Sequence, residues 1–273
     1  MGTSNAPEWL LGVWSRSILE LGSPADAAEI ERIGDQLLSR WANPARHFHG
    51  LSHLITVLER INELAQEASS PPTVRLAAFY HGAVMTTDLD SLDSHTWGED
   101  EEASADFAYA QLNHLEVAEP KAARVQWLIA SLGQRPGVIT DPDLAVLCDA
   151  ERAILASDPQ TYRAYAKSAL AEYAHVPEAT VLATRLVVLR RWLAKDRLYL
   201  TSIANTWEDA ARNNVEAELA RTVKQLQAMG VPTEPAAATP AEPAAATPAA
   251  PATAPVDEDE LDDSYWDTVM PAT

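Results

Sequence analysis

The chain has little that could cross-link, anchor or export it. Its single cysteine, Cys148 among 273 residues, cannot form an internal disulfide, which fits a reducing compartment. No apolar run approaches the roughly 18–20 residues of a membrane span. The first residues carry no basic segment ahead of an apolar stretch, so they predict no signal peptide. We therefore expect a cytoplasmic protein without a membrane partner.

Positively charged residues are also few. The chain has 20 lysines and arginines against 40 aspartates and glutamates, giving a net charge of −20. Affinity for nucleic acid depends on clustered cations, so we expect no nucleic-acid partner. Five cations between Arg185 and Arg197 could cradle a phosphate, although basic residues near a helix end more often form a solvated face.

The composition changes sharply near Gly230 and predicts three parts. Residues 1–230 are expected to form one helical domain. Residues 231–256 contain two identical Glu-Pro-Ala-Ala-Ala-Thr-Pro-Ala octads and predict a disordered Pro/Ala/Thr-rich linker. Residues 257–273 combine acids with Tyr265 and Trp266. This end is either a solvated terminus or a peptide in which residues 257–270 dock onto a protein partner.

Apolar residues in the first part recur with a helical period. Ile30, Ile33 and Leu37 lie on one helical face, and Leu54, Leu58 and Ile61 repeat the pattern. No stretch alternates with period two, so we predict an all-α helical bundle. Further helices are expected at 73–86, 100–113, 119–132, 142–157, 160–174, 178–200 and 205–229.

Two histidines are expected to face the protein interior. His53 shares a helical face with Val57 and Ile61, and His81 lies on the apolar stripe of the 73–86 helix. A lone inward histidine is usually a hydrogen-bonded core residue, but neutral imidazoles from two helices can begin a metal site. Gly82 stands out beside His81, because glycine inside a helix costs about 1 kcal/mol relative to alanine.

Two carboxylates on the 142–157 helix are expected to point in different directions. Leu144 and Leu147 belong to its apolar stripe, and at 100° per residue Glu151 lies near the centre of that stripe. Asp149 points almost opposite. A carboxylate on an apolar face must be paired, protonated or bound to a metal, so Glu151 is the stronger inward candidate.

These segments resemble, in order, the motifs of the bacterial predicted metal-dependent phosphohydrolases of the HD superfamily. The resemblance runs from about Trp9 to Leu226 and implies an all-α, HD-domain-like helical bundle. Six segments carry the resemblance. Arg46–His53 corresponds to the family pattern R-x-Y-H-x-x-x-H, Phe79–Gly82 to F-H-D and Asp100–Ser104 to N-E-E-x-S. Ser131–Gln134 corresponds to T-x-x-H, Asp149–Arg152 to D-A-D-L and Glu172–Val176 to E-Y-A-H-V.

The resemblance implies roles for particular residues. His53, His81 and either Glu151 or Asp149 would hold a divalent metal ion, which could be Zn, Mn, Fe or Mg. By likeness to the cyclic-nucleotide phosphodiesterases, His49 would be the general acid. The carboxylate of Glu101 would lie near the site. The implied ligand is a phosphorylated small molecule or a nucleotide.

The chain departs from the family pattern where the metal ligands should converge. Gly82 stands in place of the aspartate of the His-Asp pair, Gln134 in place of a histidine, Glu151 in place of an aspartate, and Phe48 in place of a tyrosine. These changes predict an impaired or lost metal site that holds no metal or supports little hydrolysis. One alternative is an active mononuclear hydrolase in which Glu151 and Asp149 replace the missing ligands. Another is a non-catalytic adaptor that docks partners through its C-terminal tail.

Overall fold

The computed structural model describes residues 7–89, 92, 98–134 and 139–233. Within these residues the regular structure is helical, and the only extended pairing is an isolated antiparallel bridge between Met85 and Glu99. The all-α prediction is therefore confirmed. None of the described helices combines the length and apolar character that a membrane crossing needs. The predicted tail, from residue 234 onward, lies outside the described residues.

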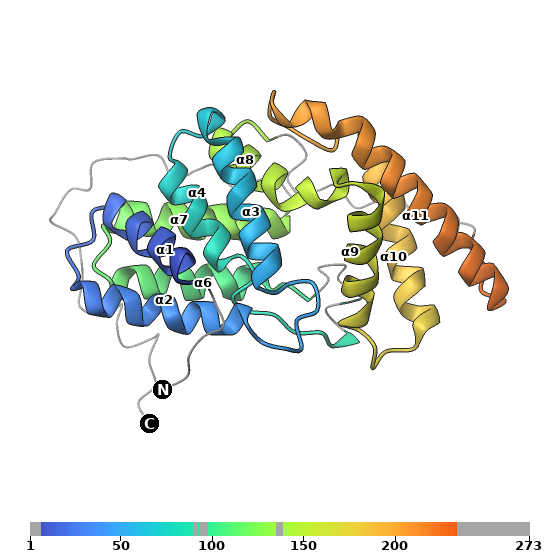
Figure 1. Ribbon diagram of the computed structural model, residues 1–273, viewed down its shortest axis with the longest axis horizontal. Coiled ribbons are helices and arrows are strands. Elements are labelled where there is room, and N and C mark those ends of the chain that lie inside the picture. Colours follow the sequence, from blue (N-terminus) through green and yellow to red (C-terminus); the bar gives the residue numbers. More distant parts are fainter. Residues whose placement is uncertain (1–6, 90–91, 93–97, 135–138, 234–273) are drawn as a thin grey trace, which may run out of the picture.

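The helices form two groups that lie side by side (Figure 1). The first group contains α1 (Glu8–Glu20), α2 (Ala27–Trp41), α3 (Leu51–Glu63), α4 (Pro71–Tyr80), α6 (Glu101–His114), α7 (Glu119–Gln134) and α8 (Pro142–Arg152). The second group contains α9 (Pro159–Ala171), α10 (Glu178–Leu193) and α11 (Glu208–Ala228). Three short 3-10 turns complete the described structure: η1 (Ala65–Glu67), η2 (Ala153–Ala156) and η3 (Ala204–Trp207).

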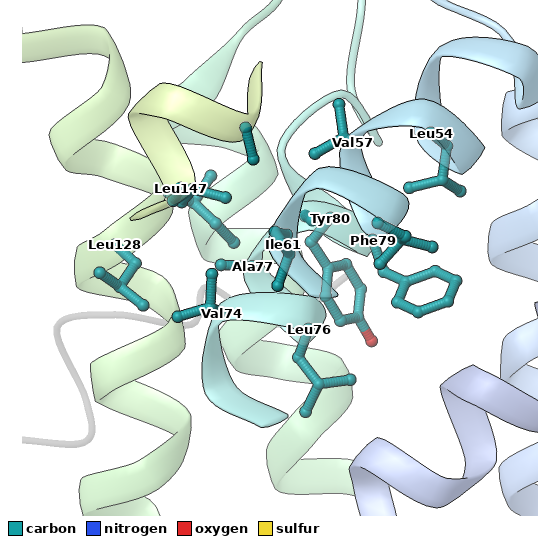
Figure 2. Close-up of a cluster of buried hydrophobic side chains, with 14 of the residues drawn as sticks. Leu54, Val57, Ile61, Val74, Leu76, Ala77, Phe79, Tyr80, Leu128 and Leu147 are labelled. Atoms are coloured by element: carbon teal, nitrogen blue, oxygen red, sulfur yellow. The ribbon is translucent and has the colours of Figure 1, made fainter. Parts of the chain in front are cut away.

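Helix α4 lies at the centre of the first group, where it contacts α1, α3, α6, α7 and α8. Seven of its ten residues are buried, as expected for a helix that is apolar over most of its surface. Figure 2 shows its side chains packed among Leu54, Val57 and Ile61 of α3, with Leu128 of α7 and Leu147 of α8 nearby. Because α4 is central, the residue that follows it, His81, is placed in the protein interior.

The helix predicted over 73–86 ends at Tyr80, so this prediction was too long. After Gly82 the chain turns and pairs with a later segment. The Thr86 N–H donates to the Gly98 carbonyl (2.8 Å), and the Asp100 N–H donates to the Val84 carbonyl (3.1 Å). These bonds, and not a further helical turn, satisfy the backbone here. Gly82 therefore lies beyond the helix, contrary to the sequence-based expectation.

A buried ion pair joins α10 to α11. Arg185 Nε lies 2.7 Å from one carboxylate oxygen of Glu218, and its Nη2 lies 3.0 Å from the other. The Tyr162 hydroxyl of α9 donates to the same carboxylate. Burial alone would raise the pKa of Glu218, but Arg185 and the hydrogen bonds outweigh it, so the pKa of this carboxyl is lowered. The predicted solvated basic face therefore does not include Arg185.

We expect Glu218→Gln to destabilise the fold by about 3–5 kcal/mol at neutral pH, because it leaves a buried guanidinium without its charge partner. Because the pKa of Glu218 is lower in the folded protein than in the unfolded chain, its carboxylate stabilises the fold at pH values above the ordinary glutamate pKa of about 4.3. This stabilisation is lost as the pH falls further. The difference between wild type and variant in urea unfolding should therefore shrink from pH 7 towards pH 3.

The matched control is Glu63→Gln, which removes an exposed pair with Arg60 on α3. It should cost no more than about 1 kcal/mol. A Glu218→Gln penalty as small as the control, or one that does not change with pH, would contradict the role of this ion pair.

Candidate metal centre

His53 and His81 meet inside the first helix group. His53 lies in the first turn of α3, and His81 directly follows α4. Only 4% of the surface of His53 and 1% of that of His81 is exposed to solvent. Their Nε2 atoms are 3.4 Å apart. His81 Nδ1 lies 2.7 Å from the Ala78 carbonyl oxygen, which can only accept a hydrogen bond. The His81 Nδ1 is therefore the protonated nitrogen, and its Nε2 keeps a free lone pair.

The third member of the site is Glu99, which was not among the predicted ligands. Its Oε1 lies 3.5 Å from His81 Nε2. One ligand atom from each of His53, His81 and Glu99 lies within 4.8 Å of the other two, and no other such group occurs among the described residues. Glu99 Oε1 is buried and receives no hydrogen bond from the described part of the chain. A buried carboxylate oxygen without a donor requires a proton or a cation.

The charges of the three groups suit a cation. Burial raises the pKa of Glu99 well above its usual range, and the nearby carboxylates of Glu151 and Glu101 raise it further. Burial lowers the pKa of His81 to about 4, and it lowers the pKa of His53 well below the ordinary value. Both shifts favour the uncharged forms, which are a neutral imidazole for each histidine and a protonated carboxyl for Glu99. A divalent ion can displace that proton and be bound by all three groups.

The position of Glu99 depends on the absence of a side chain at Gly82. A β-carbon on Gly82 would lie 2.6 Å from Cη2 of Trp41 and 3.2 Å from Glu99 Oε1. The Trp41 ring therefore fills the space that an aspartate side chain would need. The carboxylate of Glu99 lies next to that space. Position 82 therefore carries no carboxylate, and the nearest one beside it belongs to Glu99.

The two predicted carboxylate ligands of α8 lie elsewhere. Asp149 is fully buried, but its two oxygens accept the backbone N–H groups of Leu200 and Thr201 at 2.7–3.0 Å. These contacts give Asp149 a structural role. Glu151 lines a pocket beside the site but does not belong to the group of three. Glu99, and neither Asp149 nor Glu151, forms the group of three with His53 and His81.

The predicted general acid, His49, is held by Glu172. The His49 Nδ1 lies 2.6 Å from Glu172 Oε2, while Glu172 Oε1 accepts the backbone N–H groups of Phe48 and His49 at 2.8 and 2.9 Å. Despite the opposing effect of burial, the contact with His49 and these hydrogen bonds lower the pKa of Glu172. The carboxylate therefore fixes a proton on Nδ1 of His49. Sequence reasoning noted Glu172 within a motif but gave it no role.

A pocket with a volume of about 140 Å³ adjoins this centre. The predicted site residues His49, Glu101 and Glu151 line it together with Glu99. Its cations come from α8, α10 and the turn after α10: Arg152, Arg185, Arg191 and Lys195. Aromatic and aliphatic side chains, Phe48, Leu132, Ile154, Leu155, Tyr165 and Trp192 among them, complete the lining. The pocket thus joins an acidic region, a basic region and an apolar surface.

No model of a known protein family matches this chain, and comparison with curated proteins and with solved structures gives no match. The resemblance to the HD phosphohydrolases consequently remains an expectation from the sequence motifs. The side chain of Gln134, at the end of α7, lies outside the described part of the structure. The chemistry of the site is therefore inferred from the described residues around His53, His81 and Glu99.

We expect Gly82→Asp, which introduces the aspartate of the HD pattern, to destabilise the protein by about 1–3 kcal/mol, as overpacking usually does. The new side chain would overlap the Trp41 ring. Urea unfolding measures the effect. Gly12→Asp on α1 is the matched control, because a β-carbon there meets nothing within 4 Å. If Gly82→Asp is as stable as wild type, Trp41 does not exclude a side chain at this position.

Proposed function

We propose that this chain is a mononuclear metal-dependent phosphohydrolase in which His53, His81 and Glu99 hold one divalent ion. The observation that carries the proposal is the buried Glu99 Oε1, which lacks a hydrogen bond among the described residues and lies near two imidazole nitrogens. Two histidines and one carboxylate are a recurring ligand set for zinc and for non-haem iron. Imidazole ligands favour these ions over Mg²⁺, which prefers oxygen.

The residues around the centre suit hydrolysis of a small phosphate ester. A divalent ion at this place would polarise a phosphoryl oxygen and make a water molecule more acidic. His49, oriented by Glu172, would donate a proton to the leaving oxygen. Among the cations of the pocket, Arg152, Arg191 and Lys195 would bind the negative charge of a phosphorylated small molecule or nucleotide. Arg185 is paired with Glu218. Glu101 and Glu151 would accept protons or hydrogen bonds from water and substrate hydroxyls.

The proposal is limited to one metal ion. Gly82 provides no carboxylate that could bridge two ions, and the described residues contain no second group of three clustered ligands. Two-metal sites stabilise both the attacking and the leaving oxygen of a phosphoryl transfer. We therefore expect activity below that of a two-metal enzyme, in keeping with an impaired form of the HD site.

Removing a ligand should abolish tight metal binding. Removing a residue that only hydrogen-bonds to a metal ligand already lowers metal affinity by about 10–100-fold. We therefore expect His53→Ala, His81→Ala and Glu99→Gln each to weaken zinc binding by more than about 100-fold. Glu151→Gln is the matched control, because its carboxylate faces the same pocket without belonging to the ligand group. Competitive titration with a chromogenic chelator measures each affinity.

Two results would overturn this ligand set. Unchanged zinc affinity in Glu99→Gln would remove Glu99 from the site. Loss of affinity in Glu151→Gln, with Glu99→Gln unaffected, would favour the ligand set expected from the sequence. If wild-type protein binds none of Zn²⁺, Fe²⁺ and Mn²⁺ at micromolar concentration, the metal-dependent function itself fails.

Proton donation by His49 should appear in the turnover of metal-loaded protein. We expect His49→Ala to lower kcat for an alkyl phosphate by about 10²–10⁴-fold, the usual contribution of a general acid. Glu172→Gln should lower kcat less, because His49 would remain but lose its orientation. A substrate with a nitrophenolate leaving group needs little protonation and should be less affected. His114→Ala, an exposed histidine on α6, is the control; equal losses on both substrates would exclude an acid role.

A further inference from the structure

A second pocket shares part of its wall with the pocket at the candidate metal centre. We call the pocket at the metal centre the metal-side pocket and its neighbour the α8–α10 pocket; Leu132, Arg152 and Lys195 line both. The metal-side pocket has a volume of about 140 Å³ and the α8–α10 pocket about 350 Å³. Small-molecule sites usually have about 300–1,000 Å³. The metal-side pocket alone therefore has room for a phosphate group and only a small part of a larger substrate.

The α8–α10 pocket lies between the end of α8 and the segment that follows α10. Asp149 of α8 accepts the backbone N–H groups of Leu200 and Thr201. The Tyr199 hydroxyl donates to the Arg152 carbonyl at 3.0 Å. Arg152 and Leu200 themselves line the pocket. The chain's own hydrogen bonds therefore hold the two sides of this pocket together.

Positive charge predominates in the α8–α10 pocket. Its described lining residues include three cations, Arg152, Lys195 and Arg197, and one acid, Asp196. The half-buried Arg152 guanidinium makes no ion pair or hydrogen bond with the described residues. The Arg197 guanidinium donates to Asn205, which is neutral and leaves its charge uncompensated. On a chain whose net charge is −20, this pocket attracts an anion.

The rest of the lining combines a hydroxyl group with apolar surface. Ser131, in the last turn of α7, is only 2% exposed, and its hydroxyl makes no hydrogen bond with the described residues. Ile139, Leu198 and Leu200 provide apolar contacts. Guanidinium and hydroxyl groups with unused donors suit the oxygens of a phosphate group. The apolar side chains suit the carbon atoms that join such a group to the rest of a ligand.

We propose that the substrate of the metal centre carries a second phosphate group, which binds in the α8–α10 pocket. Arg152 and Lys195, which line both pockets, lie between the phosphate that is hydrolysed and the phosphate that is retained. The substrate class is thus an organic bisphosphate. This inference rests on the proposed function, because the first phosphate is the one placed at His53, His81 and Glu99.

Non-hydrolysable phosphonates test the second phosphate site without turnover. Alkyl α,ω-bisphosphonates of increasing chain length are compared by calorimetry with monophosphonates of the same length, on zinc-loaded and on metal-free protein. In zinc-loaded protein, one bisphosphonate of the series should bind at least about tenfold more tightly than the matching monophosphonate, because its second group gains charge-assisted hydrogen bonds. Metal analysis after each titration shows that the zinc is retained.

Variants on either side of the shared wall make the test specific. Arg197→Gln should lower the ratio of bisphosphonate to monophosphonate affinity several-fold. Ser131→Ala should lower it by a smaller factor, because a neutral hydrogen bond contributes less than a charged one. Arg191→Gln is the matched control, since Arg191 lines only the metal-side pocket; it should leave the ratio unchanged. Unchanged monophosphonate affinity in Arg197→Gln and Ser131→Ala shows that these variants are folded.

The outcomes separate this inference from the proposed function. Loss of zinc binding by wild-type protein overturns the metal centre, whatever the phosphonates do. Normal zinc binding without any preference for a bisphosphonate overturns only the second phosphate site. A preference that is insensitive to Arg197→Gln and Ser131→Ala, or that Arg191→Gln alone removes, places the second phosphate outside the α8–α10 pocket and also overturns the inference.

Discussion

Trp41 packs its ring against the residues that follow α4, and this contact determines the arrangement of the site. The indole Nε1 donates to the Phe79 carbonyl (2.8 Å), and the ring centroid lies 5.2 Å from that of His81. The same ring leaves no room for a β-carbon on Gly82. One aromatic side chain therefore supports the imidazole, fixes its helix end and excludes a neighbouring carboxylate. The acidic group has to come from elsewhere, and the short pairing of Met85 with Glu99 provides it.

The low polarity around the centre follows from the central position of α4. An imidazole that follows such a helix is surrounded by protein, and its neutral form is favoured. A carboxyl group in the same surroundings binds a proton or a metal ion more strongly than it would in water. The pocket beside it is different, because it combines charged groups of both signs with aromatic walls. The proposed chemistry would take place where these two environments meet.

Sequence periodicity predicted only part of the site. It predicted that His53 and His81 face inward, and both are buried. It also placed Glu151 on the inner face of its helix and Asp149 almost opposite, and this was wrong, because Asp149 is fully buried and Glu151 is half-buried. It did not predict Glu99, since this side chain is brought to the site by the bridge between Met85 and Glu99. Periodicity also predicted a helix that continued past Tyr80. The helix ends there because of contacts with residues far along the chain, namely the hydrogen bond from Val84 to Ser104 and the contact of Gly82 with Trp41, and such contacts leave no pattern in the local sequence. The signal for Glu172 was its motif, but its contact with His49 spans more than a hundred residues of chain.

The bond between Glu172 and His49 has a consequence for the order in which the site can be assembled. Glu172 follows α9 in the second helix group, whereas His49 precedes α3 in the first. The first group alone could bring His53 and His81 together, but His49 would then lack the carboxylate that holds a proton on its Nδ1. The contact between His49 and Glu172 can form only when the second helix group has been synthesised and has packed against the first. Under the proposed function, a nascent chain would be able to capture a metal ion before it could act on a phosphate ester.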